Sequence, residues 1–413
     1  MSQSRVSLAD YRTALTTPGM ARPVIASLLA RLPIAMIGLS ALLYVQRETG
    51  SFATAGLVSA GSLVGVALGA VAQGRLIDRL GPTRPLLVVS GMFAVALASL
   101  ALAIELHAPT PVLVLLGGGI GVTEPMIGSA SRALWTRVVT SESVRDAAFS
   151  YEAISMETFF ILGPGLAGLL VAAPWPGTGM VAGGGCMVTG AVLFALSPAV
   201  RAWGPAEAGR RSLLGALVSP GMRTLALAVL GFGMVIGFVE VAVPAAATEG
   251  GRPALGGVLL SLMSVGSVAF GVAYSMRPWP RRMSWRLPVL LAAFALLVAL
   301  PAWPSTLWGL ALALLAPGAL ITPQSAAHST AIETVAPPGT AAEAFGWVLT
   351  AVTLGLAIGQ SVSGYLVERH GPPASFLAAA AVGLLLAAAV WLLRGTVRPV
   401  RAEARAREEM VAA

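Results

Sequence analysis

The sequence contains no lysine and no asparagine, few charged residues, one cysteine and three histidines. Without lysine there is no G-x4-G-K-[ST] phosphate loop, so the chain is not itself an ATP-hydrolysing pump subunit. A single cysteine, Cys186, excludes an internal disulfide and any zinc site built from several cysteines. The histidines form no H-E-x-x-H motif, and we expect neither a metal nor a cofactor. Because lysine and asparagine have AT-rich codons, their absence indicates a high-GC bacterial genome.

Charge is scarce over the whole chain of 413 residues. Charged residues make up 11% of it, hydrophobic residues 56%, and the mean hydropathy is +0.83. Soluble domains carry about 25% charged residues, so most of this surface does not face water. The net charge of +8 could suggest a nucleic-acid partner, but the arginines lie in short loops and form no basic stripe interleaved with aromatic residues. The composition therefore predicts an all-α integral membrane protein with no nucleic-acid partner.

Long apolar segments alternate with charges or with Gly/Pro clusters along the chain. A spanning helix needs about 20 apolar residues, and twelve segments meet this length. The predicted spans are 22–45, 52–74, 85–106, 110–132, 146–172, 178–199, 222–247, 254–275, 286–304, 306–328, 342–366 and 373–394. The polar segment 200–221 divides them six and six. We therefore predict a six-helix bundle over 1–199, a cytoplasmic linker over 200–221, and a second six-helix bundle with a short cytoplasmic tail over 222–413.

The arginines indicate the orientation of these spans, because cytoplasmic loops carry an excess of positive charge. With both termini in the cytoplasm, 22 of the 26 arginines lie on the inner side, three lie outside and one, Arg31, lies inside a span. The first 21 residues are polar and lack the pattern of a cleavable signal. We therefore expect a multi-pass protein of the bacterial inner membrane with both ends in the cytoplasm.

The charged loop between the second and third spans carries the pattern G-x3-D-x2-G-x2-R. Its residues are Gly74, Asp78, Arg79, Gly81 and Arg84. This spacing resembles the loop between helices 2 and 3 of the major facilitator superfamily. The resemblance implies two pseudo-symmetric six-helix bundles with a central cavity lined by helices 1, 4, 7 and 10. It also implies that Asp78 helps to latch the cytoplasmic side, near a predicted capping box at residues 340–343. Gly74 is expected to end helix 2, and Gly81 to support the turn that follows.

The fifth span contains a second motif, Gly163-Pro164-Gly165 followed by Gly168. It resembles the G-P-x-x-G core of the antiporter signature of exporters in the superfamily, although the upstream glycine of that signature is absent. Pro164 removes a backbone hydrogen bond and is expected to kink the helix. The chain also departs from the family at helix 4, where the common arginine is missing. Glycines spaced by four in helices 2 and 11 predict close helix packing.

Charges inside the spans are expensive, at about 2.5–3.5 kcal/mol or more each. Arg31, Glu124 and Glu157 are predicted to lie at one depth, roughly 13–17 Å from the inner surface at about 1.5 Å per residue. We predict Glu157 as the partner of Arg31, with Glu124 as the next candidate. Glu152 precedes Glu157 by five positions. Two interpretations remain open: a fixed salt bridge that locks helices 1, 4 and 5, or a titratable site where a proton or substrate competes for Glu157 or Glu124.

Several polar and aromatic residues of other spans either line a substrate cavity or pack against lipid and neighbouring helices. These residues are Tyr44, Phe232, Glu240, Gln324, His328 and Trp347. His328 could carry a proton because its ordinary pKa is near neutral, or it could be an interfacial histidine.

The residues and the resemblance together predict proton-coupled export of a small organic molecule by a monomer, similar to actinobacterial-type drug and metabolite exporters. One alternative is an importer or uniporter of a metabolite on the same fold. An alternative of another class is a membrane sensor or scaffold that transports nothing. An enzyme is not expected, because no metal cluster and no pair of nucleophile and base stands out.

Overall fold

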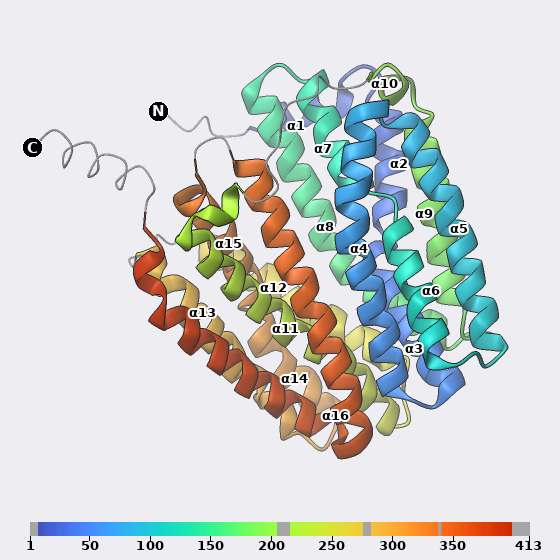
Figure 1. Ribbon diagram of the computed structural model, residues 1–413, viewed down its shortest axis with the longest axis vertical. Helices are drawn as coiled ribbons and strands as arrows, with labels where there is room; N and C mark the ends of the chain where they lie inside the picture. The colour runs from blue at the N-terminus through green and yellow to red at the C-terminus, as the bar shows by residue number, and fades with distance from the viewer. Residues whose placement is uncertain (1–6, 205–214, 276–281, 338–339, 399–413) are drawn as a thin grey trace, which may run out of the picture. The chain divides into compact units, whose positions relative to one another are not determined.

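The computed structural model describes residues 7–204, 215–275, 282–337 and 340–398, and in these ranges the ordered elements are all helices (Figure 1). Ten helical stretches are long and apolar enough to cross a membrane. A further apolar helix, Leu255–Gly271, is shorter, and the longest helix is interrupted at Gly371 by a non-helical backbone conformation. The number of twelve spans therefore stays a prediction.

The chain forms two compact units, 1–50 with 64–209 and 51–63 with 210–413. The helices of the first unit are α1 (Leu8–Thr16), α2 (Ala21–Arg31), α3 (Ile34–Thr49), α5 (Thr83–Glu105), α6 (Thr110–Thr123), α7 (Ile127–Val138), α8 (Glu142–Val171), α9 (Thr178–Ala195) and α10 (Pro198–Arg201). The helices of the second unit are η1 (Ala216–Val218), α11 (Pro220–Glu249), α12 (Leu255–Ser275), α13 (Met283–Val298), η2 (Leu300–Ala302), α14 (Leu307–Gly318), α15 (Ile321–Val335), α16 (Ala341–Leu392) and η3 (Arg394–Thr396). Helix α4 (Phe52–Leu80) contributes its first turns to the second unit and the rest to the first.

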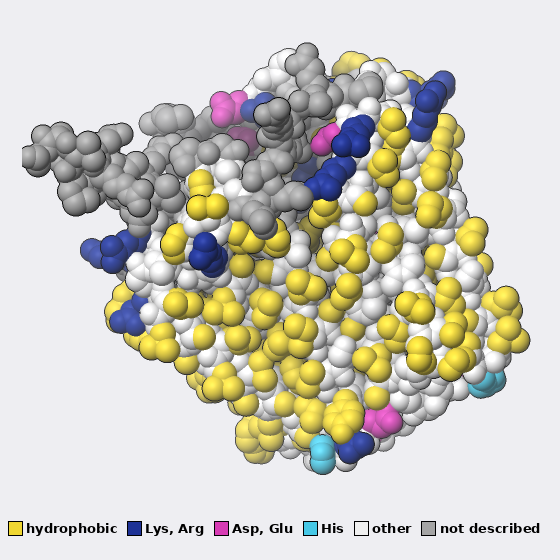
Figure 2. All heavy atoms as spheres, viewed as in Figure 1, with side chains coloured by type: hydrophobic (Ala, Val, Ile, Leu, Met, Phe, Trp, Pro, Cys, Tyr) yellow, Lys and Arg dark blue, Asp and Glu magenta, His cyan; other side chains and the backbone are white. Residues whose placement is uncertain are grey.

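Apolar side chains cover much of the protein surface, as a protein embedded in lipid requires. Leu68, Val95, Leu115, Leu312 and Leu385 are each more than 60% exposed. Figure 2 shows many such side chains over one face, with arginines near its upper end. In water this surface would be unstable, because burying apolar area is the main force that drives folding. In lipid the same side chains contact acyl chains.

Glycines allow pairs of helices to approach until their backbones touch. In the first unit, a Cβ atom on Gly65 of α4 would overlap the Gly118 carbonyl oxygen of α6, and one on Gly69 would overlap that of Val122. Only residues without a side chain permit such close packing. The predicted close-packing role is thus confirmed for these two glycines.

In the second unit, α11 and α16 are in reciprocal contact through two glycines on each helix. Any Cβ atom on these four residues would overlap a carbonyl oxygen of the partner helix. The four residues are Gly233, Gly237, Gly355 and Gly359. The two glycines on each helix are four residues apart, so they lie one above the other on a single face.

A short helix, α1, precedes the first span and was not predicted. Ser7 and Asp10 form a reciprocal capping box, and Ser143 at the start of α8 donates to the Asp10 carboxylate at 3.2 Å. The hydrogen bonds from the Ser7 side chain and backbone hold the pKa of Asp10 below its usual range. The S-x-x-D spacing is the sequence signal for this helix.

The predicted capping box at residues 340–343 is wrong. Thr340 precedes α16 but its side chain caps nothing, and Glu343 instead accepts the Ala216 backbone N–H at 3.0 Å. This carboxylate therefore caps η1, a short helix inside the predicted linker. Residues 205–214 of that linker lie outside the described residues.

The predicted orientation can be tested by labelling single cysteines in a Cys186→Ala background. A cysteine replacing Ser284, at the start of α13, is expected to react with a membrane-impermeant maleimide only from the cytoplasmic side. A cysteine replacing exposed Arg252, between α11 and α12, is expected to react only from outside. The measurement compares intact cells with inverted vesicles. Labelling of both positions from one side would show that the span count between them is wrong.

Candidate functional site

Two spans of the first unit are broken helices, and each break lies beside a predicted charged residue. Helix α2 ends at Arg31, and α3 begins at Ile34, just after Pro33. Helix α6 ends at Thr123, and α7 begins at Ile127 after Glu124, Pro125 and Met126. Proline has no backbone N–H and cannot continue the helical hydrogen-bond ladder. Broken helices in transporters place backbone polar groups and side chains at the depth where ligands bind.

A side chain from α4 replaces the hydrogen bonds that the break between α6 and α7 loses. The Gln73 amide nitrogen donates to the carbonyl oxygens of Val122 at 3.0 Å and of Glu124 at 2.8 Å. The Gln73 amide oxygen accepts the Met126 backbone N–H at 3.2 Å. Unpaired backbone groups in lipid would each cost several kcal/mol. Gln73 therefore stabilises the break, a role that sequence reasoning missed.

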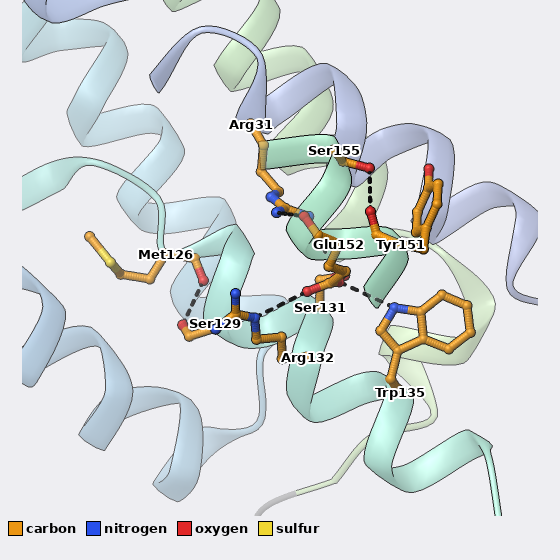
Figure 3. Close-up of polar contacts among 9 residues, drawn as sticks. All are labelled: Arg31, Met126, Ser129, Ser131, Arg132, Trp135, Tyr151, Glu152 and Ser155. Carbon is orange, nitrogen blue, oxygen red and sulfur yellow. Dashed lines mark hydrogen bonds and ion pairs between the residues drawn. The ribbon is translucent and has the colours of Figure 1, made fainter. Parts of the chain in front are cut away.

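The buried carboxylate of Glu152 on α8 is the centre of a polar cluster (Figure 3). It accepts hydrogen bonds from the Ser131 hydroxyl and, at 3.2 Å, from the Trp135 indole nitrogen, both on α7. A guanidinium nitrogen of Arg31 lies 3.8 Å from the carboxylate, and another donates to the Glu152 backbone oxygen at 3.1 Å. We call these residues, together with Arg132, the Glu152 cluster.

Arg132 completes the cluster from its exposed side. Its Nε lies 3.4 Å from Glu152 Oε2, and its side chain is 60% exposed, whereas the side chains of Arg31 and Glu152 are 3% and 1% exposed. Burial strengthens charge interactions and raises the cost of leaving a charge unpaired. The cluster therefore joins three elements, α2, α7 and α8, around one carboxylate, with two arginines for one acid.

The predicted partner of Arg31 was Glu157, and this pairing is wrong. Glu157 lies five residues after Glu152 on α8, and its side chain is exposed. Five residues turn a helix by about 500°, or roughly 140° in net rotation, so these two glutamates face different directions. Glu157 makes no hydrogen bond or ion pair with any residue that the structure describes.

Glu124, the other predicted carboxylate, lies in the break between α6 and α7 and is partly buried. Its backbone oxygen accepts the Gln73 amide, but its carboxylate has no partner within the described part of the chain. Of the three acids predicted for the site in this unit, Glu124 and Glu157 therefore do not belong to the Glu152 cluster.

Tyr44, a predicted cavity residue of the first unit, lies in another polar group near the end of α3. Its hydroxyl donates to the Glu105 carboxylate, which also accepts the Trp175 indole N–H at 2.6 Å. The Tyr44 and Trp175 rings are 5.7 Å apart in an edge-on arrangement. Tyr44 is fully buried by these contacts, so the structure gives it a packing role.

The remaining predicted cavity residues belong to the second unit. Glu240 on α11 accepts the Gln360 amide of α16 at 2.6 Å. His328 on α15 lies 5.6 Å from Phe232 of α11, measured between ring centroids, and Gln324 lies one turn before His328. Trp347 packs against the apolar core between α11, α15 and α16.

The motif at residues 74–84 lies at the end of α4 and the start of α5. Gly74 does not end the helix, because α4 continues to Leu80; this expectation was wrong. Gly81 adopts a positive φ of 76°, which supports the predicted turn. Arg84 lies in the first turn of α5, and Arg79 in the last turn of α4. The latch function of Asp78 stays a prediction.

The antiporter-like motif lies inside α8, which runs past Pro164 to Val171 without interruption. A Cβ atom on Gly163 would approach the Ala35 side chain to 2.9 Å, so this glycine lets α8 pack against the first turn of α3. Gly168 is buried. The motif thus supports the packing of the helix beside the break at Pro33.

These observations define a class of protein: a polytopic helical membrane protein with broken spans and an ion cluster buried within one unit. In the described residues no group of histidine, cysteine, aspartate or glutamate is arranged to hold a metal ion. The chain matches the Major Facilitator Superfamily over residues 24–322 and 281–412, and it belongs to this family. It is therefore a transporter by family and not an enzyme.

Solved structures of several transporters share the fold. The nucleoside transporter NupG is 16% identical with a TM-score of 0.72, and the match covers 90% of this chain and 99% of that one. A bacterial homolog of the human lysosomal transporter Spinster is 14% identical with a TM-score of 0.67, covering 95% and 99%. The human organic anion transporter MFSD10 is 16% identical with a TM-score of 0.60, covering 90% and 99%. No curated protein matches the chain. At these identities the likeness concerns the fold alone.

Proposed function

We propose that this protein is a proton-coupled exporter of a small organic molecule, with twelve spans in the bacterial inner membrane and both termini in the cytoplasm. Transport follows from the family. Proton coupling is supported by one observation: Glu124 and Glu157 lie within spans, and neither carboxylate has a partner among the described residues. A carboxylate without a fixed partner can gain and lose a proton without breaking a structural contact.

The exposure of Glu157 supports the same proposal. A charged side chain in the hydrocarbon layer costs about 2.5–3.5 kcal/mol or more, so acids within spans usually face water or a substrate path. Glu157 is exposed on α8, just over one turn beyond the Glu152 cluster. We propose that Glu157 lies on a water-filled path and exchanges protons there, while the Glu152 cluster holds α2, α7 and α8 in place beside it.

Export and coupling can be tested together even though the substrate is unidentified. Cells that express the wild-type protein are expected to release at least one compound, detected by untargeted mass spectrometry of the medium, that control cells retain. Glu157→Gln and Glu124→Gln should each lower this release at least tenfold at unchanged expression, because neither amide can carry a proton. Glu142→Gln, an exposed acid at the first turn of the same helix α8, is the matched control and should transport normally.

The compound found in this way is then loaded into proteoliposomes that contain the purified protein. An imposed pH gradient should accelerate its movement, and a proton ionophore should abolish the acceleration. Depletion of a compound from the medium in place of release would indicate an importer. Transport that ignores the gradient would indicate a uniporter, and either result would contradict the proposal.

A further inference from the structure

Three polar atoms on one face of α15 are buried and have no hydrogen-bond partner among the described residues. They are the amide nitrogen and amide oxygen of Gln324 and the Nε2 atom of His328. The two residues are four positions apart on a helix, so their side chains lie on the same face. Their exposures are 1% for Gln324 and 5% for His328.

Such atoms need an explanation, because native proteins satisfy nearly all their buried polar groups. Some other polar side chains of the second unit do have hydrogen-bond partners. Thr322 of α15 shares a 2.7 Å hydrogen bond with Ser267 of α12, and Glu240 accepts the Gln360 amide at 2.6 Å. Gln324 differs from Gln360 because both of its amide atoms are unpaired among the described residues, whereas the Gln360 amide keeps one hydrogen bond. A buried polar group without a protein partner usually binds a ligand or water.

One aromatic ring, that of Phe232, packs against His328 on this face. The Phe232 ring of α11 lies 5.6 Å from the His328 ring at an interplanar angle of 67°, and Phe294 of α13 lies 5.2 Å from Phe232. Aromatic rings pack favourably against the faces or edges of other flat groups. The surroundings therefore favour a flat, apolar-faced group whose polar atoms lie at its edge.

The chemistry of the Gln324 side chain further restricts the chemical class of the ligand. A primary amide offers donors and an acceptor in one plane. A cation only donates and a carboxylate only accepts, so either would leave one Gln324 atom unpaired. A neutral ring with an N–H group beside a carbonyl group pairs with both atoms at once and leaves a further edge atom for His328.

We propose that the Gln324–His328 face of α15 recognises the transported molecule through an uncharged cyclic amide edge, as found in lactams, imides and nucleobases. This inference rests on the proposed function for the idea that the ligand is cargo, but the binding itself does not depend on coupling. It makes Gln324 the residue that selects the substrate class.

The test uses uracil as the probe and 1,3-dimethyluracil, which lacks both N–H groups, as the matched probe. Binding to the purified full-length protein in detergent is measured by calorimetry or ligand-observed NMR. The wild-type protein should bind uracil at least tenfold more tightly than 1,3-dimethyluracil. Gln324→Met, which keeps the length of the side chain without its polar atoms, should lose this preference. Gln46→Leu, on α3 of the first unit, is the control and should bind like the wild type.

The same variant separates a ligand site from a site filled by structural water. If a ligand normally pairs with the amide, ligand-free Gln324→Met should melt at the same or a higher temperature than the wild type, because an unpaired buried amide has been removed. A lower melting temperature would show that the amide is already paired, and would overturn the proposal. So would equal binding of the two probes, or wild-type uracil binding by Gln324→Met.

The outcome is independent of the export assay. Selective uracil binding with no gradient-driven transport would leave this inference standing and contradict the proposed function. Gradient-driven export by a protein that binds both probes equally would support the proposed function and contradict this inference.

Discussion

Glu152→Gln is expected to lower the free energy of unfolding by about 3–5 kcal/mol, the cost of leaving buried charge without its partner. The substitution keeps the size of the side chain but removes the only acid within ion-pair distance of Arg31 in the described chain. The measurement is thermal or denaturant-induced unfolding of the purified protein in detergent. Glu157→Gln is the matched control on the same helix; its side chain is exposed, and it should change stability by less than about 1 kcal/mol.

A double variant shows whether the loss comes from the ion pair. Arg31→Met combined with Glu152→Met removes both buried charges and should recover part of the stability, because an apolar pair of similar volume replaces a buried ion pair at little cost. The recovery is partial because Ser131 and Trp135 lose their hydrogen-bond acceptor. Arg132 would lose its partner too, but its side chain is 60% exposed and can be solvated. A loss in the double variant that equals the sum of the losses of Arg31→Met and Glu152→Met alone would contradict the pairing.

Gly359→Leu is expected to prevent the stable packing of α11 against α16. A Cβ atom at this position would overlap the Met234 carbonyl oxygen, so even alanine should separate the two helices. Overpacking of side chains costs about 1–3 kcal/mol, and here the obstacle is the rigid backbone of the partner. The expected result is little or no monodisperse protein for Gly359→Leu and a clearly lowered melting temperature for Gly359→Ala, measured by size-exclusion chromatography and thermal unfolding.

Gly346→Ala is the control on the same helix, and it should not lower the stability of the protein. No atom lies within 4 Å of a Cβ atom built at Gly346, which is exposed on α16. Alanine is favoured over glycine in a helix interior by up to about 1 kcal/mol, so this variant should be as stable as the wild type or more stable. Equal losses at residues 346 and 359 would show that the helix crossing is not the cause.

The features that the sequence predicted correctly depend only on the order and spacing of residues along the chain. The apolar segments lie in helices, Gly81 makes the predicted turn, and Gly65 and Gly69 lie where helices touch. The pairing of Arg31 was not predicted correctly, because depth along a helix does not say which way a side chain points. In the structure, the buried positions of α8 include Ala148, Glu152, Ser155 and Phe159, which recur every three or four residues and place Glu152 on the packed face.

Other features had no signal in the sequence. Nothing in the spacing of Gln73 relates it to Glu124, which follows it by 51 residues. The unpaired amide of Gln324 could be recognised only from the hydrogen bonds of the folded chain. Interactions of this kind depend on the three-dimensional arrangement of helices, which a count of residues cannot supply.

The Gln73 contacts have a mechanical consequence for the fourth predicted span. The Gln73 side chain supplies hydrogen bonds to backbone groups on both sides of the joint between α6 and α7. These backbone groups are therefore paired although the helix is interrupted. A tilt of α7 relative to α6 would then expose no peptide group to lipid, as long as the Gln73 amide keeps these hydrogen bonds. The half formed by α7 would carry Ser131, Arg132 and Trp135 with it. A small rotation of the backbone at Glu124 would then move the α7 residues that contact Glu152. The joint would therefore couple the acid at the break to the Glu152 cluster.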